Sequence, residues 1–394
     1  MLSRPAAPTP TIATAVLWTA LLTGCAAGSD VPREAAPPAA PSAPAPSPTP
    51  ACTPASLASR AAATLVVGIP GVSSADDALG QSVVDLGVGG LFLSEPNVES
   101  EEQVTALVAG LRERAGRPLL VSTDEESGRV AVTREIVGAG PSPRRLARER
   151  TPGQVREYAR GIGTRLKAVG VDLDLAPLLD LDATAPRGII GDRSFSADPA
   201  VAATYGLAFS AGLSDAGVHP TVKHFPGQGR STIDTHAEGD VVEATLAELR
   251  RTDLLPFQEA IDAGAPVVML NHLGYSALDA DLPASLSPKA YALLREMGFQ
   301  GVAMTDSVGM GAVNLRFDFD KAAVMAVAAG VDAVLATDGN QAVRMRDAIV
   351  AAVADGTLPE DRVSEAAARV TALAGGDPMA MSCLAVTSPT LQVP

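Results

Sequence analysis

The chain has 394 residues and a formal net charge of −15 at pH 7, and hydrophobic residues make up 47% of it. Such an excess of carboxylates excludes the basic surface that nucleic acids and anionic membrane surfaces attract. A chain of this length and hydrophobicity can bury a large core. We therefore expect a folded domain of substantial size with no nucleic-acid partner.

Residues 1–25 have the pattern of an export signal. Arg4 precedes the apolar stretch 11–22, and small residues lead to Cys25. The apolar stretch is too short to span a membrane comfortably. The ending Leu-Thr-Gly-Cys at 22–25 resembles the bacterial lipobox, which implies that Cys25 is lipidated and anchors the protein to a membrane. The alternative is an ordinary signal peptide that contains this cysteine by chance.

Residues 26–54 consist mainly of Ala, Pro and Ser, with hardly any large apolar side chain. Such a segment cannot bury enough surface to offset the entropy lost on ordering. We therefore predict a disordered tether that holds the following domain away from the membrane.

From residue 64 onward, short runs rich in Val, Leu and Ile recur along the chain. Each run is nearly continuous in apolar residues, which is typical of strands buried on both faces by helices. Eight such runs are predicted as strands: Thr64–Ile69, Gly90–Ser94, Pro118–Thr123, Val171–Ala176, Pro220–His224, Pro266–Asn271, Gly301–Thr305 and Val331–Ala336.

The segments between these runs have helical spacing. They include Glu102–Arg114, Gln154–Val169, Leu254–Ala263 and Gln341–Ala354, and Gly170 stands where a helix would end. Eight strand–helix units predict an α/β fold, a (β/α)8 TIM barrel, as one catalytic domain over 55–378 with a tail at 379–394. An open doubly wound sheet is the alternative, because the number of strands does not prove closure.

Polar side chains follow five consecutive predicted strands. They are Asp124 after the third strand, Asp180 after the fourth, Lys223-His224 at the fifth, His272 after the sixth and Asp306 after the seventh. Active sites of barrels of this kind lie at the carboxyl ends of the strands. The sequence therefore predicts an active site at this end of the barrel.

Two further cysteines, Cys52 and Cys383, stand at opposite edges of the predicted domain. In an exported protein such a pair is expected to form a disulfide. The alternative is two unpaired thiols, since sequence alone does not show proximity.

The segment from Lys223 to His236 is the most informative part of the chain. It contains Lys-His-Phe-Pro-Gly-Gln-Gly at 223–229 and Asp-Thr-His at 234–236, and it holds two of the four histidines. Glycine and proline among charged residues indicate a shaped loop around a polar ligand. An ordinary Gly/Pro-rich connection is the less favoured interpretation.

Other chemistries lack their motifs. The chain has no dinucleotide-binding Gly-x-Gly-x-x-Gly at a strand–helix junction, no P-loop and no Gly-x-Ser-x-Gly nucleophile elbow. No His-x-x-x-His or similar ligand spacing favours a metal. We therefore expect no metal and no cofactor. A carboxylate at a strand end with a His–Asp pair on a loop fits acid/base and nucleophilic chemistry on a neutral, polyhydroxylated substrate.

Several motifs in order resemble the single-domain bacterial β-N-acetylglucosaminidases of glycoside hydrolase family 3. The resemblance covers about residues 65–374. It rests on Asp-Glu-Glu-Ser-Gly-Arg-Val at 124–130, Leu-Ala-Pro at 175–177, Asp-Arg-Ser-Phe at 192–195, the two motifs at 223–229 and 234–236, and Met-Thr-Asp at 304–306.

The resemblance implies roles for individual residues. Asp306 would be the nucleophile that forms a glycosyl-enzyme, and His236 paired with Asp234 would be the general acid/base. The substrate-binding residues would be Asp124, Arg193, Lys223 and His224. Arg129 would support these residues without touching the sugar.

The chain departs from the family pattern at a few positions. Glu125 and Ser127 replace the Gln and first Gly of the first motif, Gln228 stands where His is common, and Thr235 replaces a frequent Ser. A side chain at Ser127 would reshape this turn if the backbone there has a positive φ. No departure removes a predicted catalytic group.

The resemblance implies a retaining exo-glycosidase, a β-N-acetylhexosaminidase, that removes terminal non-reducing β-linked N-acetylglucosamine. Two alternatives belong to other classes of protein: a β-N-acetylglucosaminide phosphorylase, and a catalytically silent sugar-binding lipoprotein. Hydrolysis is favoured over both.

An export signal places the protein outside the cytoplasm, either lipid-anchored to the outer face of the cytoplasmic membrane or secreted. Peptidoglycan fragments that end in N-acetylglucosamine are the substrates expected there. We expect a monomer whose partner is this carbohydrate and whose contact with the membrane is limited to the lipid.

Overall fold

The computed structural model describes residues 52–182 and 188–393. The export signal with Cys25 and nearly all of the predicted tether lie outside these residues. Eight parallel strands lie side by side in the order β11-β9-β7-β6-β3-β2-β1-β12. Their bounds are β1 Leu65–Gly68, β2 Gly90–Leu93, β3 Leu120–Thr123, β6 Leu173–Asp174, β7 His219–Phe225, β9 Val267–Leu270, β11 Val302–Thr305 and β12 Val334–Ala336.

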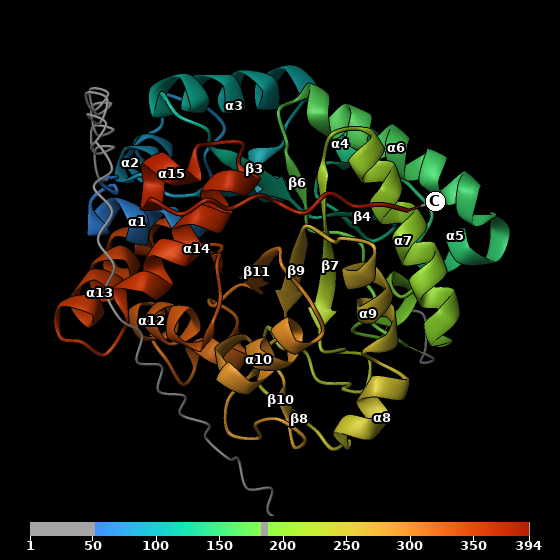
Figure 1. The fold of residues 1–394 in the computed structure, drawn as a ribbon. Helices are drawn as coiled ribbons and strands as arrows, with labels where there is room; N and C mark the ends of the chain where they lie inside the picture. Colours follow the sequence, from blue (N-terminus) through green and yellow to red (C-terminus); the bar gives the residue numbers. More distant parts are fainter. Residues whose placement is uncertain (1–51, 183–187, 394) are drawn as a thin grey trace, which may run out of the picture. The chain divides into compact units, whose positions relative to one another are not determined.

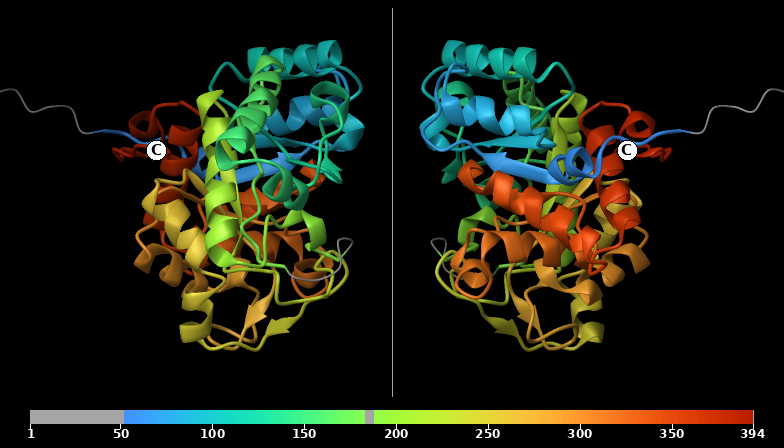
Figure 2. Two further views of the ribbon diagram at one scale, coloured as in Figure 1. Left: turned by 90° about the vertical axis from the view of Figure 1, so that its right-hand side faces the viewer. Right: turned by 90° about the vertical axis from the view of Figure 1, so that its left-hand side faces the viewer.

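The two outer strands of this order also meet, so the sheet closes on itself. Met304 and Ala333 form a parallel bridge between β11 and the entry of β12. The N–H of Thr305 donates to the carbonyl of Ala333 at 3.1 Å. The closed sheet confirms the predicted (β/α)8 barrel and excludes the open doubly wound alternative. Figures 1 and 2 show the strands enclosed by a ring of helices.

Fourteen helices form most of this ring or lie in the loops at its rim. Their bounds are α1 Leu57–Ala63, α2 Ala78–Leu86, α3 Glu101–Ala115, α4 Arg134–Val137, α5 Pro143–Glu149, α6 Pro152–Ala168, α7 Pro199–Asp215, α8 Leu246–Arg251, α9 Leu255–Asp262, α10 Pro288–Glu296, α11 Gly311–Asn314, α12 Phe319–Ala329, α13 Ala342–Ala354 and α14 Glu360–Leu373. A short α15, Pro378–Ser382, follows them. Within the two described stretches, no helix combines the length and apolar character needed to cross a bilayer.

Helix α6 shows how the sequence sets the element bounds. The Thr151 hydroxyl accepts from the N–H of Gln154, and the Gln154 side chain accepts from the N–H of Thr151, which forms a capping box. Pro152 occupies the first turn, where its missing N–H costs nothing. Gly170, just past the end, has a φ of +89°, as the predicted stop at this glycine requires.

Apolar side chains alternate between the two faces of the barrel strands. Val66 of β1 belongs to the cluster inside the barrel together with Phe92, Leu120 and Met269. Its neighbour Val67 packs into the larger cluster between the strands and the helices. Both faces of the sheet are therefore buried, which explains the nearly continuous apolar runs in the sequence.

Four short strands at the rim were not predicted. β4 (Glu125–Ser127) pairs antiparallel with β5 (Val130–Ala131), and β8 (Val241–Val242) pairs parallel with β10 (Gly274–Tyr275). Strands of two or three residues are too short for periodicity to reveal them. Strand β6 is also shorter than the predicted run 171–176 and contains only two residues.

The two ends of the barrel domain meet where the strands begin. Cys52 and Cys383 are joined in a disulfide, and the N–H of Ala55 donates to the carbonyl of Met381 at 3.1 Å. Ala55 and Met381 line a cavity with Pro118, which precedes β3. The last residues then cross in front of the barrel in Figure 1, from α15 toward α7, and the N–H of Gln392 donates to the carbonyl of Ala263 at 2.7 Å.

Candidate active site

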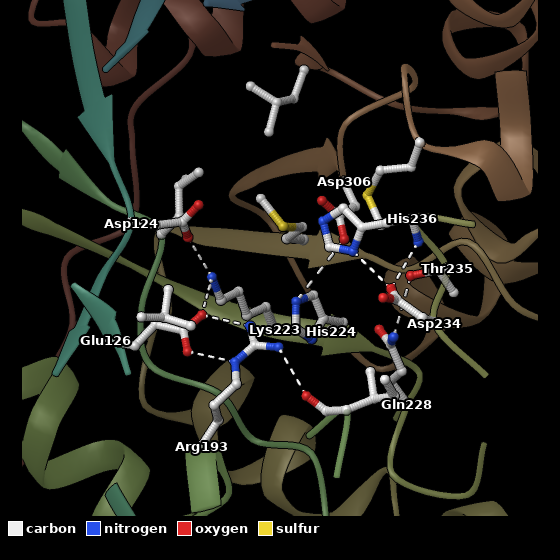
Figure 3. Close-up of a pocket in the computed structure, with 16 residues that line it drawn as sticks. Asp124, Glu126, Arg193, Lys223, His224, Gln228, Asp234, Thr235, His236 and Asp306 are labelled. Atoms are coloured by element: carbon white, nitrogen blue, oxygen red, sulfur yellow. Dashed lines mark hydrogen bonds and ion pairs between the residues drawn. The ribbon is translucent and has the colours of Figure 1, made fainter. Parts of the chain in front are cut away.

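A pocket of about 210 Å³ lies at the carboxyl ends of the strands. This volume is below the roughly 300–1,000 Å³ of typical ligand pockets, which limits the bound group to a small one. Figure 3 shows its polar side chains pointing toward one another. The lining comprises Asp124, Glu126, Val130, Leu175, Ile189, Arg193, Lys223, His224, Gln228, Asp234, Thr235, His236, Met269, Asp306, Met310 and Leu335.

Strand β7 brings Lys223 and His224 into this pocket together. In a regular strand two consecutive side chains point to opposite faces. Here the pairing with β9 shifts between Val222 and Phe225, which leaves one extra residue on β7. Because of this irregularity, both Lys223 and His224 line the pocket.

One wall of the pocket is a network of two cations and two carboxylates. The Lys223 Nζ lies 2.6 Å from Asp124 Oδ1 and 2.7 Å from Glu126 Oε1. Arg193 donates two hydrogen bonds to the two oxygens of Glu126, each at 2.7 Å. Burial raises the pKa of Glu126, but Arg193 and Lys223 outweigh burial and lower it to about 2. Glu126 is therefore ionised near neutral pH and is paired with both cations.

Glu126 is the residue of this network that the sequence prediction omitted. It stands in the motif at 124–130 but was assigned no role. The short hairpin β4–β5 turns at Ser127 and Gly128, whose φ values are 69° and 71°. The backbone at position 127 therefore has the positive φ considered from the sequence, although the residue there is serine and not glycine. The Ser127 Oγ bonds to the Pro141 carbonyl at 2.7 Å, which holds the hairpin in place.

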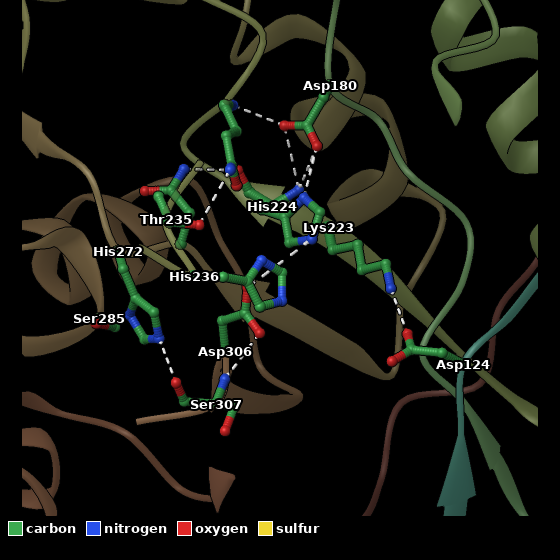
Figure 4. Close-up of polar contacts among 12 residues, drawn as sticks. Asp124, Asp180, Lys223, His224, Thr235, His236, His272, Ser285, Asp306 and Ser307 are labelled. Carbon is green, nitrogen blue, oxygen red and sulfur yellow. Dashed lines mark hydrogen bonds and ion pairs between the residues drawn. The ribbon is translucent and has the colours of Figure 1, made fainter. Parts of the chain in front are cut away.

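Asp180 orients the imidazole of His224 from behind. The Asp180 Oδ2 lies 2.6 Å from His224 Nδ1, and Oδ1 accepts from the N–H of Gln228 at 2.6 Å. Figure 4 shows this carboxylate on the side of His224 away from Asp306. The other ring nitrogen, Nε2, lies 4.0 Å from Asp306 Oδ2. Asp180 was recognised as a strand-end residue but not as a partner of His224.

Asp306 follows β11 directly, and its side chain is 19% exposed. Burial raises the pKa of this carboxyl, but His272, His224, the N–H of Ser307 and the Lys223 ammonium outweigh burial and lower it. The Ser307 N–H donates to Oδ1 at 2.7 Å. Asp306 is therefore an ionised carboxylate with one oxygen, Oδ2, left to face the pocket.

His272 supports this arrangement without lining the pocket. It is buried, its Nδ1 lies 2.7 Å from the Ser285 hydroxyl, and its Nε2 lies 2.8 Å from the Ser307 carbonyl. Nε2–H therefore donates to the Ser307 carbonyl, and Nδ1 shares a hydrogen bond with the Ser285 hydroxyl. Burial lowers the pKa of His272.

His236 and Asp234 stand on an exposed loop beside Asp306 (Figure 3). The His236 Nδ1 lies 2.8 Å from Asp234 Oδ1, and the exposed fractions of the two side chains are 76% and 49%. Hydrogen bonds from the backbone N–H and the ring of His236 lower the pKa of Asp234. The carboxylate thus holds a proton on Nδ1 and leaves Nε2 for other partners.

Thr235 lies between these two residues and is buried. Its hydroxyl is 3.4 Å from the amide nitrogen of Gln228. Arg129 lies outside the pocket, where it pairs with Asp192 at 3.1 Å and donates to the carbonyls of residues 188–190. The structure therefore gathers all seven predicted catalytic and binding residues at one pocket, places the disulfide at the other end of the barrel, and does not include Cys25 in its described part.

A closed parallel barrel whose strand ends surround a small pocket of carboxylates, with a His–Asp pair at the rim, has the arrangement of a glycoside hydrolase. The chain belongs to glycoside hydrolase family 3, because residues 64–373 match the glycosyl hydrolase family 3 N terminal domain.

Known relatives agree with this membership. The β-hexosaminidase LpqI of Mycobacterium tuberculosis is 36% identical over 323 residues, which cover 79% of this chain and 81% of that protein. A β-hexosaminidase of Stenotrophomonas maltophilia is 38% identical over 235 residues, which cover 57% of this chain and 69% of that protein.

Solved structures give the same result. The structure of M. tuberculosis LpqI superposes with a TM-score of 0.76 at 36% identity, covering 83% of this chain and 98% of that one. A family 3 β-N-acetylglucosaminidase from Paenibacillus sp. FPU-7 superposes with a TM-score of 0.77 at 31% identity, covering 84% of this chain and 64% of that one.

Proposed function

We propose that this glycoside hydrolase removes terminal non-reducing β-linked N-acetylglucosamine with retention of configuration at the anomeric carbon. The observation that carries the proposal is that the Asp306 carboxylate lines the same small pocket as the His236–Asp234 pair. The relatives named β-hexosaminidase and β-N-acetylglucosaminidase support the choice of sugar. A pocket closed at one end fits an enzyme that acts on the last sugar of a chain.

Asp306 is the proposed nucleophile. Its lowered pKa keeps it charged, and its Oδ2 faces the pocket. In the first step this oxygen bonds to the anomeric carbon while the glycosidic C–O bond breaks. The lysine ammonium and the His224 ring near Asp306 stabilise the free carboxylate, so they also favour its departure in the second step.

His236 is the proposed general acid/base. Asp234 binds Nδ1, so Nε2 gives its proton to the leaving oxygen in the first step and accepts a proton from the attacking water in the second. An imidazole can both donate and accept a proton, which suits both directions of transfer. The carboxylate of Asp234 fixes the tautomer and stabilises the protonated ring.

The network of Asp124, Arg193, Lys223 and the His224 imidazole is proposed to bind the sugar hydroxyls. Glu126 keeps Arg193 and Lys223 in position through its two-sided ion pair. Since both cations are already paired with carboxylates, their remaining N–H groups offer directed hydrogen bonds to a neutral sugar without attracting an anionic one.

The charge of the pocket favours water over phosphate as the acceptor. Four carboxylates, Asp124, Glu126, Asp234 and Asp306, line it against two permanent cations, Arg193 and Lys223. A phosphate entering beside Asp306 would meet this net negative charge. Hydrolysis is therefore proposed ahead of phosphorolysis.

Export and lipidation at Cys25 remain part of the proposal, with peptidoglycan fragments as the source of substrate and a monomer as the working form. Cell fractionation with a Cys25→Ala variant tests it. Loss of the membrane-bound fraction in the variant would support a lipid anchor, and a wholly cytosolic unmodified protein would contradict export.

The direct test is release of 4-nitrophenol from 4-nitrophenyl β-N-acetylglucosaminide. Asp306→Asn should abolish turnover, while Asp281→Asn, a change at an exposed aspartate away from the pocket, should leave it unchanged. Repeating the assay in phosphate and in a neutral buffer distinguishes sugar phosphate from free sugar as the product. A folded protein that binds N-acetylglucosamine but releases no nitrophenol would indicate the sugar-binding alternative.

A further inference from the structure

The loop that carries His236 is attached to the segment that follows Asp306. The N–H of Gly311 donates to the carbonyl of His236 at 2.9 Å, and the N–H of Ala312 donates to the carbonyl of Thr235 at 3.1 Å. These two bonds join residues from different strand ends. They connect the loop of the proposed acid/base to the strand of the proposed nucleophile.

The attachment uses the beginning of helix α11. The first N–H groups of a helix have no partner within the helix, and Met310 at the cap position provides no side-chain bond. In α11, Gly311 and Ala312 find their partners in the carbonyls of the acid/base loop. The loop therefore caps the helix, and the helix holds the loop.

Gly311 makes this contact possible because it has no side chain. A Cβ at this position would lie 2.3 Å from the carbonyl oxygen of Ala237 and 2.7 Å from that of His236. Both distances are below any real contact of a Cβ atom, and both partners are backbone, which cannot swing aside. The φ of Gly311 lies outside the left-handed region, so space and not backbone conformation requires glycine here.

We propose that Gly311 is a positioning residue for the general acid/base: its missing side chain lets the loop of residues 234–238 sit close enough to hold His236 beside Asp306. The inference rests on the proposed roles of these two residues. A side chain at position 311 would push the loop outward and move His236 while leaving Asp306, at the end of β11, in place.

The two reacting groups can be distinguished by chemistry. In the first step Asp306 bonds to the anomeric carbon, the C–O bond to the leaving group breaks, and the His236 proton goes to the leaving oxygen. A leaving group such as 2,4-dinitrophenolate departs as a stable anion and needs no proton. A phenol leaving group does need one, so only its departure depends on the position of His236.

The test compares Gly311→Ala with Gly239→Ala. Both changes add one methyl group to the same pair of segments, but a Cβ at Gly239 meets nothing closer than the Ala312 carbonyl at 3.9 Å. For each variant, kcat/KM is measured on the phenyl and the 2,4-dinitrophenyl β-N-acetylglucosaminides. Gly311→Ala is expected to lose about 10²-fold on the phenyl glycoside and to keep its rate on the dinitrophenyl one, whereas Gly239→Ala keeps both.

A second variant covers the case in which Gly311→Ala fails to fold, which thermal unfolding would reveal. Ala312→Pro removes the N–H that donates to Thr235, and proline is tolerated in the first turn of a helix. Like Gly311→Ala, it should lower kcat/KM on the phenyl glycoside relative to kcat/KM on the dinitrophenyl glycoside. Unchanged ratios in a folded variant at either position would overturn the inference. An unmodified protein that cleaves neither glycoside would instead overturn the proposed function.

Discussion

The Nδ1 of His224 lies 2.6 Å from Oδ2 of Asp180, a carboxylate that is 1% exposed. The same carboxylate accepts from the backbone N–H groups of His224 and Gln228. One buried side chain therefore sets both the ring orientation of His224 and the path of the loop that follows β7.

Asp180→Asn should impair substrate binding without removing a group that touches the sugar. An asparagine offers one acceptor oxygen and an NH2 group in place of two acceptors, so the bond to Nδ1 or to Gln228 is lost. A hydrogen bond to a charged group contributes roughly 1.5–3 kcal/mol, which predicts a loss of about 10- to 100-fold in kcat/KM. Steady-state kinetics would check this, and an unchanged kcat/KM in a folded variant would contradict it.

Protonation of Glu126 should lower the stability of the protein in acid. Its folded pKa is lowered from 4.5 to about 2, so its contribution is fully present above pH 4.5 and is lost as the pH falls toward 2. The lowered pKa corresponds to about 3 kcal/mol. Urea unfolding at several pH values should show this loss of stability in acid for the unmodified protein and not for Glu126→Gln. The variant should be less stable than the unmodified protein at pH 7, because Arg193 and Lys223 lose their shared partner. An equally steep acid dependence in Glu126→Gln would contradict the assignment.

The neighbouring Glu125 should act in the opposite direction. Burial raises its pKa from 4.5 to about 7, despite hydrogen bonds from Thr133. A raised pKa in a carboxyl means that folding loses stability as the pH rises from 4.5 to 7, by about 3 kcal/mol in total. Glu125→Gln keeps an acceptor for Thr133 and cannot ionise, so it should raise the free energy of unfolding at pH 7.5 and change it little at pH 4. Denaturant titrations at these two pH values check the sign, and a variant less stable at pH 7.5 would refute it.

The Cys52–Cys383 disulfide should matter for stability and not for catalysis. It closes a sequence separation of 331 residues, and a bridge of this kind typically contributes about 2–4 kcal/mol. Reduction should therefore lower the denaturation midpoint while kcat/KM at 25 °C stays the same, because the bridge lies at the opposite end of the barrel from the pocket. The Cys52→Ser/Cys383→Ser double variant is the control and should not respond to reductant. A fall in kcat/KM of the folded, reduced protein would contradict this prediction, because it would show that the disulfide influences the pocket.

The sequence was sufficient for the barrel because its strands are buried on both faces. Runs such as 267–270 and 302–305 are apolar at almost every position, and each is followed by a polar residue that marks the strand end. The hairpin at 125–131 and the two-residue strands had no such signal. The loops around them are held by hydrogen bonds of side chains such as Ser127 and Asp240, which come from tertiary contacts and not from a local pattern.

The predicted site residues were found through motifs, whereas their partners depend on closure of the barrel. Lys223 and Asp124 are 99 residues apart in the chain, and His224 and Asp180 are 44 apart. No local pattern indicates that Glu126 lies between two cations or that Asp180 lies behind an imidazole. Gly311 is similar, because its importance comes from a loop more than seventy residues earlier that passes over it.

The joined ends of the domain have a consequence for how the enzyme can be held. Residue 52 and the C-terminal stretch both lie where the strands begin, and the pocket opens where they end. A bead or a fused protein attached at residue 52 or at the C-terminal stretch is therefore joined at the end of the barrel opposite the entrance. Such an attachment requires no change to the loops that form the pocket.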